Sequence, residues 1–274
     1  MIVTRTPYRI SFFGGGTDYI EWFGKYGGAI LATTINKYCY VTLSSNGTSW
    51  KYFDLNTQSG LATSSAYTVG LLRACSHLDK IALARLAVEW ERDKSGNNVG
   101  YQDPYVCALG GMLHLTFNGK GVEVDAITED LTYLQSRLML VYTGPREIGS
   151  YGVIEEQLAN VKSNKSILEQ IHRLVDEGIK SIGNSDFGYL LNETWQLKKQ
   201  LSEHTTSSKI DAIYEKALKA GALGGKLLGA GNGGYLLLYA ELEKQEEIET
   251  ILGNVVKFEF ESGGSKVVYS DGMV

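Results

Sequence analysis

Residues 60–72, GLATSSAYTVGLL, run from a glycine through small hydroxyl residues directly into a helical pattern. Such a turn presents unpaired backbone N–H groups and the positive end of the helix dipole to an anion. Ser64 and Ser65 add hydroxyls that can bind phosphate oxygens or Mg²⁺. The stretch is not a Walker A loop, because no Gly-Lys-Ser/Thr occurs at that spacing. By itself it indicates a phosphate site or an ordinary helix N-cap about equally.

A second glycine-dense stretch is KLLGAGNGGYLLLY, residues 226–239. Gly229, Gly231 and Gly234 match GxGxxG, but a dinucleotide-binding fingerprint needs a strand before it and a helix after it. The expected order here is helix, glycine loop, strand, which excludes a dinucleotide fold. Glycine leaves room for backbone to approach a phosphate chain. With six glycines between residues 224 and 234, that role is favoured over a flexible connector.

Two carboxylates lie between these stretches. A helical pattern over residues 79–94 places Glu91 beside an apolar stripe that includes Ala87 and Val88. A carboxylate there is costly unless it is paired or binds a cation. Mg²⁺ carried by a nucleotide and a buried ion pair with an arginine are the two alternatives. Asp103 is interpreted as a loop residue, where spacing alone favours a turn cap over a catalytic base.

The segment RISFFGGGTDY, residues 9–19, places Arg9 in a strand pattern and Asp18 after a glycine turn. Asp18 can accept hydrogen bonds from sugar hydroxyls, and Arg9 can stabilise charge on a transferring phosphoryl group. The alternative is a surface hairpin with a solvated aspartate.

Composition narrows the class of protein. The 274 residues are 43% hydrophobic and 21% charged, which is ordinary for a globular protein of one or two domains. A net charge of −5 argues against a general nucleic-acid binder. The three cysteines form no CxxC pair, which favours a reducing compartment. The four histidines show no metal-ligand spacing, so we expect any metal to arrive with a substrate.

The N-terminus lacks the charged start and apolar run of a signal peptide, and no apolar stretch is long enough to span a bilayer. We therefore expect a cytoplasmic protein with neither nucleic-acid nor membrane partners. The sequence leaves open whether it forms a homodimer.

The expected elements alternate at first and become mostly helical beyond a soft boundary near residue 135. Strand patterns cover residues 1–13 (interrupted by Pro7), 38–44, 111–117, 137–143, 235–240, 255–261 and 266–270. Helical patterns cover residues 64–78, 79–94, 150–161, 164–182, 186–202, 208–220 and 243–252. Residues 45–60 are polar and interpreted as irregular.

Three motifs, taken together and in this order, resemble those of the GHMP kinases: PYRISFFGGGTDY (7–19), GLATSSAYTVGLL (60–72) and GALGGKLLGAGNGGYLLLY (221–239). That family includes galactokinase, homoserine kinase, mevalonate kinase and phosphomevalonate kinase. The chain looks most like the D-glycero-D-manno-heptose 7-phosphate kinase branch, which NVGYQDPYVCALGG (98–111) and NETWQLKKQL (192–201) also resemble. The similarity covers nearly the whole chain.

The resemblance implies an α+β fold of two domains, with ATP and substrate meeting in the cleft between them. Residues 1–135 would form an N-terminal, ATP-binding domain of the ribosomal-S5-domain-2 type with a left-handed βαβ unit, shortened between residues 45 and 59. Residues 136–274 would form a ferredoxin-like C-terminal domain.

The resemblance also implies residue roles in MgATP-dependent phosphoryl transfer, which needs positioning and charge neutralisation. Asp103 would polarise or deprotonate the sugar hydroxyl, and Arg9 would act on the transferred group. Ser65 and Glu91 would hold Mg²⁺. The residues implied at ATP are Gly60, Leu61, Ala62, Thr63, Ser64, Ser65, Gly229, Gly231, Gly233 and Gly234. The residues implied at the sugar are Gly15, Gly16, Thr17, Asp18 and Arg146.

The chain departs from the family pattern at four places. The segment YTGPREIGS, residues 142–150, is one residue shorter than its family counterpart before Arg146. Ala62 and Asn232 stand where the motifs carry glycine, although alanine disfavours a positive φ and asparagine tolerates it better. The segment between residues 45 and 59 lacks a few tens of residues that shape the nucleotide pocket. Trp50, Tyr52 and Phe53 either replace a stacking surface there or belong to the core.

Three functions follow as alternatives. The first is an active kinase that phosphorylates a sugar or sugar phosphate, with heptose 7-phosphate as the favoured acceptor. The second is a catalytically impaired relative that binds a sugar or a partner protein, favoured by the shortened segment. The third is another GHMP chemistry, such as a galactokinase-like or mevalonate-like enzyme.

Overall fold

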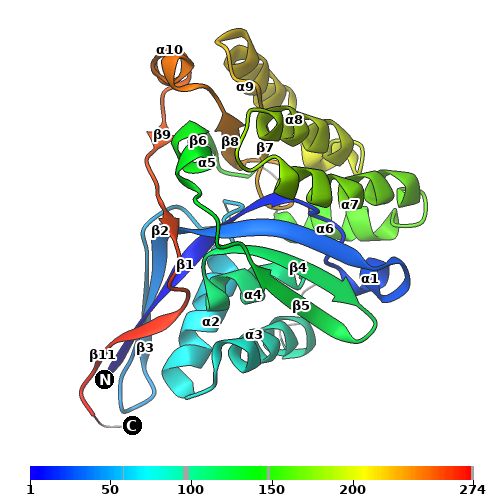
Figure 1. Ribbon diagram of the computed structural model, residues 1–274. Helices are drawn as coiled ribbons and strands as arrows, with labels where there is room; N and C mark the ends of the chain where they lie inside the picture. Colours follow the sequence, from blue (N-terminus) through cyan, green and yellow to red (C-terminus); the bar gives the residue numbers. More distant parts are fainter. Residues whose placement is uncertain (58, 95–98, 147–148, 273–274) are drawn as a thin grey trace.

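Two antiparallel β-sheets with flanking helices form the part of the chain that the computed structural model describes, which is residues 1–57, 59–94, 99–146 and 149–272 (Figure 1). The larger sheet has the strand order β11-β1-β2-β4-β5, and β3 and β10 also pair with β2. Its strands are β1 (Ile2–Phe13), β2 (Gly28–Leu43), β3 (Ser49–Phe53), β4 (Met112–Asn118), β5 (Gly121–Ala126), β10 (Phe260–Glu261) and β11 (Lys266–Ser270).

Strand β2 explains how the larger sheet holds the phosphate-loop motif. One edge of β2 pairs with β1 from Leu31 to Leu43, so β3 and β4 must share its other edge. Both run antiparallel to β2 and hence parallel to each other, and the intervening helices connect them. These helices are α2 (Thr63–Cys75), α3 (Lys80–Glu89) and α4 (Gln102–Leu109). The loop that connects β3 to α2 therefore starts at the edge of the larger sheet. The left-handed sense of this crossover stays a prediction.

The smaller sheet has the strand order β7-β8-β6-β9. Its strands are β6 (Leu138–Gly144), β7 (Gly224–Leu227), β8 (Gly234–Tyr239) and β9 (Val255–Val256). Between β6 and β7 lie α6 (Ser150–Ala159), α7 (Lys165–Lys180), α8 (Asp186–Lys198) and α9 (Ser208–Lys219), and α10 (Leu242–Leu252) connects β8 to β9. This sequence of strands and crossovers is that of a ferredoxin-like sheet, so the expected α+β fold is confirmed.

The two sheets share one hydrophobic core, and the other face of the smaller sheet packs against α9 and α10 in a second, smaller cluster. Helix α7 packs on β1 and β2, on the side of the larger sheet opposite to α2 (Figure 1). Phe187 of α8 contacts Phe12 and Phe13 of β1 edge-on, with ring centroids 5.2 and 5.0 Å apart. Because such aromatic contacts bury large areas, the two halves are packed together rather than loosely linked. The residues that line the space between them are consequently fixed in position.

The division of the chain at residue 135 falls inside a short helix, α5 (Thr132–Arg137). Strands β10 and β11, near the C-terminus, hydrogen-bond to β2 and β1 of the larger sheet. The last strands thus return to the sheet formed by the first part of the chain. The two-domain division at residues 135 and 136 stays a prediction.

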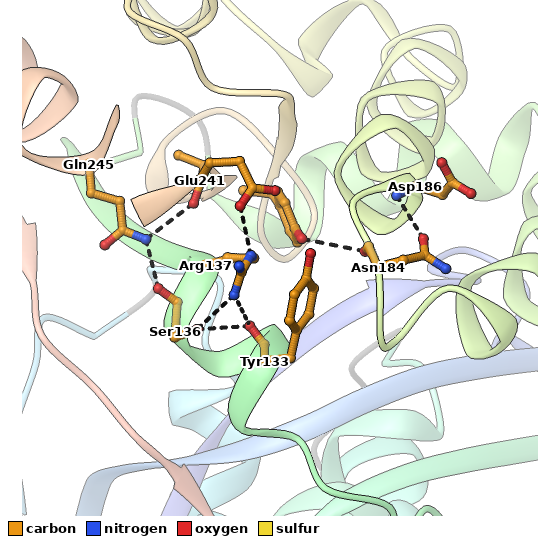
Figure 2. A network of polar contacts seen from close by, with 9 residues as sticks. Tyr133, Ser136, Arg137, Asn184, Asp186, Glu241 and Gln245 are labelled. Atoms are coloured by element: carbon orange, nitrogen blue, oxygen red, sulfur yellow. Dashed lines mark hydrogen bonds and ion pairs between the residues drawn. The ribbon is translucent and has the colours of Figure 1, made fainter. Parts of the chain in front are cut away.

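A polar network fixes α5 to the smaller sheet (Figure 2). Arg137 donates from Nε to Glu241 Oε2 at 2.8 Å, and its guanidinium carbon lies 3.6 Å from the centroid of the Tyr133 ring. Gln245 Nε2 of α10 donates to the carbonyl of Ser136 at 2.7 Å. These contacts hold the start of β6 against the end of β8, two strands whose other ends reach the glycine loop.

The structure corrects several sequence predictions in the first half. Strand β1 continues through Pro7, because the β1–β2 register shifts between Pro7 and Tyr8 and a bulge tolerates the missing N–H. Residues 45–60 are not wholly irregular, since they contain β3. The helix expected over residues 79–94 ends at Glu89 and continues as a π-helix, Trp90–Lys94. A helix, α1 (Ile20–Tyr26), and the first ten residues of β2 were not predicted.

Asp103 was interpreted as a loop residue, which is wrong. It lies in the first turn of α4, followed by Pro104, whose fixed φ suits a helix start. The short α4 ends at Gly110, which has a φ of 80°. In the second half, β7 occupies part of the stretch expected to be a loop. A strand still follows the glycine loop, so the exclusion of a dinucleotide fingerprint holds.

Within the described residues, no helix is both long and apolar enough to cross a membrane.

Candidate active site

A cavity of about 540 Å³ lies where the two sheets meet. The phosphate-loop motif and β3 line one part of it, and the glycine turn after β1 together with the start of α4 lines another. The start of α6, the end of α8 and the glycine loop between β7 and β8 complete the wall. The three motifs, distant in sequence, therefore meet at one cavity.

The phosphate-loop motif turns into α2 through a residue with left-handed backbone. Ala62 is the N-cap of α2 with φ 59° and ψ 34°, a conformation that favours glycine. Gly60, Ala62, Thr63, Ser64 and Ser65 line the cavity. Leu61, by contrast, is fully buried, and its carbonyl accepts the backbone N–H of Arg9 at 3.2 Å. The turn thus offers its own backbone and hydroxyls to the cavity while Leu61 fixes it to β1.

The glycine loop contacts the phosphate-loop motif backbone to backbone. A Cβ added at Gly60 would lie 2.3 Å from the carbonyl oxygen of Leu228, and one added at Gly229 would lie 2.6 Å from Gly60 Cα. Gly229 lines the cavity. Gly231, Gly233 and Gly234 instead pack against the backbone of Thr205, Pro145 and Ser59, respectively. These three glycines pack behind the loop, and Gly229 is the one of the four that lines the cavity.

Arg9 and Asp103 both line the cavity and form an ion pair, in which Arg9 is buried and Asp103 is partly exposed. Arg9 donates from Nε to Asp103 Oδ1 at 2.7 Å, and Nη2 lies 2.7 Å from the same oxygen. Arg9 Nη1 donates to the carbonyl of Gly60 at 2.8 Å. One arginine therefore connects the carboxylate on α4 to the phosphate-loop motif. The surface-hairpin interpretation of Arg9 is wrong.

Ser65, which lines the cavity, forms a second polar pair with Glu91, which is buried and is not among the lining residues. Ser65 Oγ donates to Glu91 Oε2 at 2.9 Å. Glu91 Oε1 is buried and has no hydrogen-bond partner among the described residues. Burial raises the pKa of Glu91 to about 7. No described arginine pairs with Glu91, which rules out the ion-pair alternative within those residues. The π-helix at Trp90–Lys94, a type of irregularity common at functional sites, carries this carboxylate.

Asp18 is buried in the wall of the same cavity. Its carboxylate accepts from the backbone N–H groups of Gly16 and Gln102, each at 3.3 Å. Burial, with the nearby Asp103 charge, raises the pKa of Asp18 to about 6. Gly15 and Gly16 line the cavity with it. Thr17 instead points into the fold, where its hydroxyl donates to the carbonyls of Gly14 and Ala29.

Arg146 reaches the junction of the two loops from the end of β6. Its Nη2 lies 2.5 Å from the position that a Cβ on Gly229 would take, the same position that lies 2.6 Å from Gly60 Cα. Nε and Nη2 are buried and have no hydrogen-bond partner among the described residues. Burial, followed by the proximity of Arg9, lowers the pKa of Arg146 to about 10. An unpaired guanidinium of this kind fits a phosphate group.

Several lining residues were missed by the sequence analysis. Lys198 and Lys226 are buried in the cavity wall, and Lys51 and Tyr67 line it beside the phosphate-loop motif. Phe53, which was considered for a stacking surface, also lines the cavity. The helical spacing of Phe187, Leu191, Thr194 and Trp195 continues to Lys198, so the buried face of α8 was a usable signal. Trp50 and Tyr52 are 57% and 64% exposed, so they are not core residues.

The strained backbone at Ala62 gives a stability prediction. Replacing Ala62 by glycine should raise the free energy of unfolding by about 1 kcal/mol, because a side chain disfavours the left-handed region. Ala66→Gly in the interior of α2 is the matched control and should lower it by about 1 kcal/mol. Urea denaturation followed by circular dichroism measures both, and a destabilising Ala62→Gly would show that the turn is not strained.

Comparisons with known proteins agree with this arrangement. The family description "GHMP kinases N terminal domain" matches residues 34–111, and "GHMP kinases C terminal" matches residues 176–257. D-glycero-alpha-D-manno-heptose 7-phosphate kinase of Campylobacter jejuni is 28% identical over 335 aligned positions, which cover 97% of this chain and 98% of that protein. A mevalonate kinase of Thermococcus sibiricus is 32% identical over 70% of this chain and 59% of its own length.

Solved structures show the same fold. A D-glycero-D-manno-heptose 1-phosphate kinase from Bacteroides thetaiotaomicron superposes with a TM-score of 0.78 at 22% identity, over 98% of this chain and 100% of that one. A mevalonate kinase superposes with a TM-score of 0.72 at 17% identity, over 96% and 100%. With its three motifs assembled at one cavity and both halves matched, the chain belongs to the GHMP kinase family of ATP-dependent phosphotransferases.

Proposed function

We propose that the protein transfers the γ-phosphoryl group of ATP to a hydroxyl of a sugar phosphate, with D-glycero-D-manno-heptose 7-phosphate as the acceptor. The observation that carries this is the Arg9–Asp103 ion pair, which lies directly against the phosphate-loop motif. The resemblance to a heptose 7-phosphate kinase along 97% of the chain supports the choice of acceptor.

Asp103 is the residue proposed to accept the proton of the acceptor hydroxyl. Its Oδ1 is oriented by Arg9, and its other oxygen is free of that constraint. Arg9 also contacts the carbonyl of Gly60, so its charge lies where the phosphoryl group leaves the nucleotide. A fixed cation at that place stabilises negative charge that develops on the transferred group. Phosphoryl transfer requires little else from the protein beyond alignment.

The ATP phosphates are proposed to bind at Gly60–Ser65, against the N-terminus of α2, where backbone N–H groups and the helix dipole favour anions. The base would then extend toward Lys51, Phe53 and Tyr67, which line the same part of the cavity. Lys51 Nζ lies 4.7 Å from the centroid of the Tyr67 ring. An aromatic ring and a cation at this place compensate for part of the shortened segment between residues 45 and 59.

The residues present fit a magnesium ion carried by ATP. Glu91 Oε1 is a buried carboxylate oxygen without a described partner, and the Ser65 hydroxyl is hydrogen-bonded to the other oxygen. Oxygen ligands of this kind suit Mg²⁺, which is usually held by one or two carboxylates and the substrate phosphates. When bound, the ion would neutralise charge on the phosphates. No cluster of three or more His, Cys, Asp or Glu side chains that could hold a metal by itself occurs in the described chain.

The acceptor is proposed to bind between Asp18 and Asp103. Asp18, Gly15 and Gly16 line the cavity on that side, and the carboxylate can accept hydrogen bonds from sugar hydroxyls. Arg146 is proposed to bind phosphate at the junction of Gly60 and Gly229, where the transferred group passes from donor to acceptor.

A release assay for ADP tests this function. The purified protein should form ADP from MgATP when heptose 7-phosphate is present and much less when heptose, galactose or mevalonate replaces it. The galactokinase-like and mevalonate-like alternatives predict the opposite preference. Equal turnover of all four compounds, or turnover of mevalonate alone, would rule out the proposed acceptor.

A second candidate is a catalytically impaired protein that binds a sugar ligand. This candidate is favoured by the shorter length of the chain, because the alignment to the Campylobacter relative has 335 positions whereas this chain has 274 residues. The relative therefore contains segments that this chain lacks. Isothermal titration calorimetry with Mg²⁺ and a non-hydrolysable ATP analogue separates the two candidates. Binding that weakens in Ser65→Ala supports the kinase, and no binding at millimolar analogue supports the impaired form.

The raised pKa of Asp18 gives a pH prediction. Burial raises that pKa from 3.8 to about 6, so the carboxylate that accepts sugar hydroxyls is lost below this pH. We expect kcat/KM for the acceptor to fall about tenfold per pH unit below about pH 6. Protonating Asp18 stabilises the folded state as the pH falls from about 6 to 3.8, so this group does not cause acid unfolding there. The Asp18→Asn variant should have low activity, and its kcat/KM should not show this fall at acid pH. If the fall were unchanged in Asp18→Asn, a group other than Asp18 would be responsible for it.

A further inference from the structure

Two buried lysines in the cavity wall have no part in the proposed phosphoryl transfer. Lys226 of β7 is 2% exposed and Lys198 at the end of α8 is 6% exposed. Burial lowers the pKa of Lys226 to about 7, and it lowers that of Lys198 well below the usual value, with Lys226 and Arg146 adding to the effect. Burying an ammonium group is costly unless an opposite charge or hydrogen bonds compensate.

Backbone carbonyls compensate only in part. Lys226 Nζ donates to the carbonyls of Ser11 and Phe12 at 3.0 and 2.8 Å. Lys198 Nζ donates to the carbonyl of Leu227 at 3.0 Å and to that of Gly229. An ammonium group has three N–H donors, so these bonds use two on each lysine. The carbonyls fix both ammonium groups in place and leave a third donor on each.

Ser11 supplies an unpaired hydroxyl beside the lysines. Its side chain lines the cavity, it is 5% exposed, and its Oγ has no hydrogen-bond partner among the described residues. Its own carbonyl is one of the two that hold Lys226. An unsatisfied buried hydroxyl is unfavourable, so a ligand atom that accepts its hydrogen bond would remove that cost.

Of the four cations deep in the cavity wall, one has a carboxylate partner among the described residues. The cations that line the cavity deep in the wall are Arg9, Arg146, Lys198 and Lys226. Arg9 is paired with Asp103, whereas the Lys226 pKa responds to the charge of Asp18 on the acceptor side. Glu91, the proposed magnesium ligand, is not among the groups whose charge shifts the pKa of either lysine. The lysines are therefore placed for an anionic group of the acceptor.

We propose that Ser11, Lys198 and Lys226 form a subsite for a phosphate group that the acceptor already carries, which makes the protein selective for a phosphorylated sugar over the free sugar. This inference rests on the proposed function. The hydroxyl and the two ammonium groups each donate one hydrogen bond to the phosphate oxygens. The negative charge of the phosphate compensates the positive charges of the two buried lysines. Only this group is recognised here, while the hydroxyl to be phosphorylated lies at Asp103.

The test compares two acceptors that differ only in the phosphate, heptose 7-phosphate and heptose. Lys198→Met removes one donor, and Ser11→Ala removes another without breaking a described hydrogen bond. The matched control is Lys199→Met, one residue along, whose ammonium lies 3.6 Å from Asp211 on a more exposed face. Hydrogen bonds to a charged group contribute about 1.5–3 kcal/mol. The preference in kcat/KM for heptose 7-phosphate over heptose should therefore fall about 10- to 100-fold in Lys198→Met and about tenfold in Ser11→Ala.

Each outcome of this comparison supports or overturns the phosphate subsite. An equal loss on both acceptors in Lys198→Met, or a wild-type protein without preference between them, would overturn the subsite even though the kinase activity stands. If the wild-type protein phosphorylates neither compound, calorimetry with heptose 7-phosphate decides instead. Binding that Lys198→Met abolishes and Lys199→Met preserves upholds the subsite while the proposed function falls. No binding by the wild-type protein overturns both.

Discussion

Asp103→Asn should lower kcat by on the order of 10²- to 10⁴-fold, the usual contribution of a positioned general base. Asparagine has nearly the same shape and can still accept the hydrogen bond from Arg9, so the geometry of this pair should persist. What is lost is the capacity to take the proton of the acceptor hydroxyl. Steady-state kinetics with MgATP and heptose 7-phosphate measures the change, and the KM for ATP should stay within about threefold.

The matched control is Asp125→Asn on β5, where the carboxylate is largely exposed and distant from the cavity. That variant should keep the wild-type kcat. A kcat for Asp103→Asn within threefold of wild type would contradict the assigned base and would leave Arg9 and the phosphate loop as the whole of the catalytic apparatus. Unfolding of Asp103→Asn is distinguished by its melting temperature.

Glu91→Gln should have opposite effects on activity and on stability. Loss of the proposed magnesium ligand should lower kcat/KM for ATP on the order of 10²-fold or more, since a metal ion contributes several kcal/mol to charge stabilisation. The ligand-free protein should become more stable by about 1–3 kcal/mol. The physical reason is that Glu91 Oε1 is buried without a described partner, so a neutral side chain removes the cost of burying its charge. Urea denaturation at pH 8 measures the stability.

Glu89→Gln, an exposed position two residues earlier on α3, is the control for both measurements. It should change neither stability nor turnover. A Glu91→Gln variant that loses stability together with activity would indicate a structural carboxylate. In that case a partner that keeps Glu91 ionised in the ligand-free state would have to exist, and the magnesium role would be withdrawn.

The sequence alone was sufficient to predict the local structure where the residues of one motif determine its backbone conformation. The glycine and hydroxyl residues of 60–65 predicted a turn into a helix, which the structure contains. Gly229 was expected to let backbone approach a phosphate chain; in the structure it packs against Gly60, and its role at a phosphate stays a prediction. The order of motifs also indicated the fold. Arg9 was singled out in a strand pattern and Asp18 after a glycine turn, and both line the cavity. Their roles stay predictions.

The features that were not predicted depend on tertiary contacts or on elements too short to show a clear pattern. Asp103 was placed in a loop, because a helix as short as α4 has too few turns for a clear period and Pro104 reads as a breaker. Lys226 lies in a buried strand where only long-range bonds to Ser11 and Phe12 explain it. Such partners are separated by more than two hundred residues, and spacing within one segment carries no signal of them. Thr17 was predicted at the sugar, yet its hydroxyl hydrogen-bonds to backbone within the fold.

The departures from the family pattern had uneven consequences. Ala62 and Asn232 both adopt positive φ, 59° and 63°, so the chain keeps the glycine-type backbone without glycine. The shortened segment retains β3, which brings Lys51 and Phe53 to the cavity. Backbone geometry can persist through a substitution because neighbouring contacts determine it, which a sequence pattern alone does not reveal.

The most direct test of the account is to follow the phosphoryl group itself. The protein is incubated with heptose 7-phosphate and ATP labelled with ¹⁸O in the γ-phosphoryl group, and the sugar is analysed by mass spectrometry. The account predicts a heptose bisphosphate that carries the labelled group, formed by wild-type protein and by Asp125→Asn, and strongly reduced with Asp103→Asn. Unlabelled acceptor after prolonged incubation with folded protein, or label recovered only as inorganic phosphate, would contradict it.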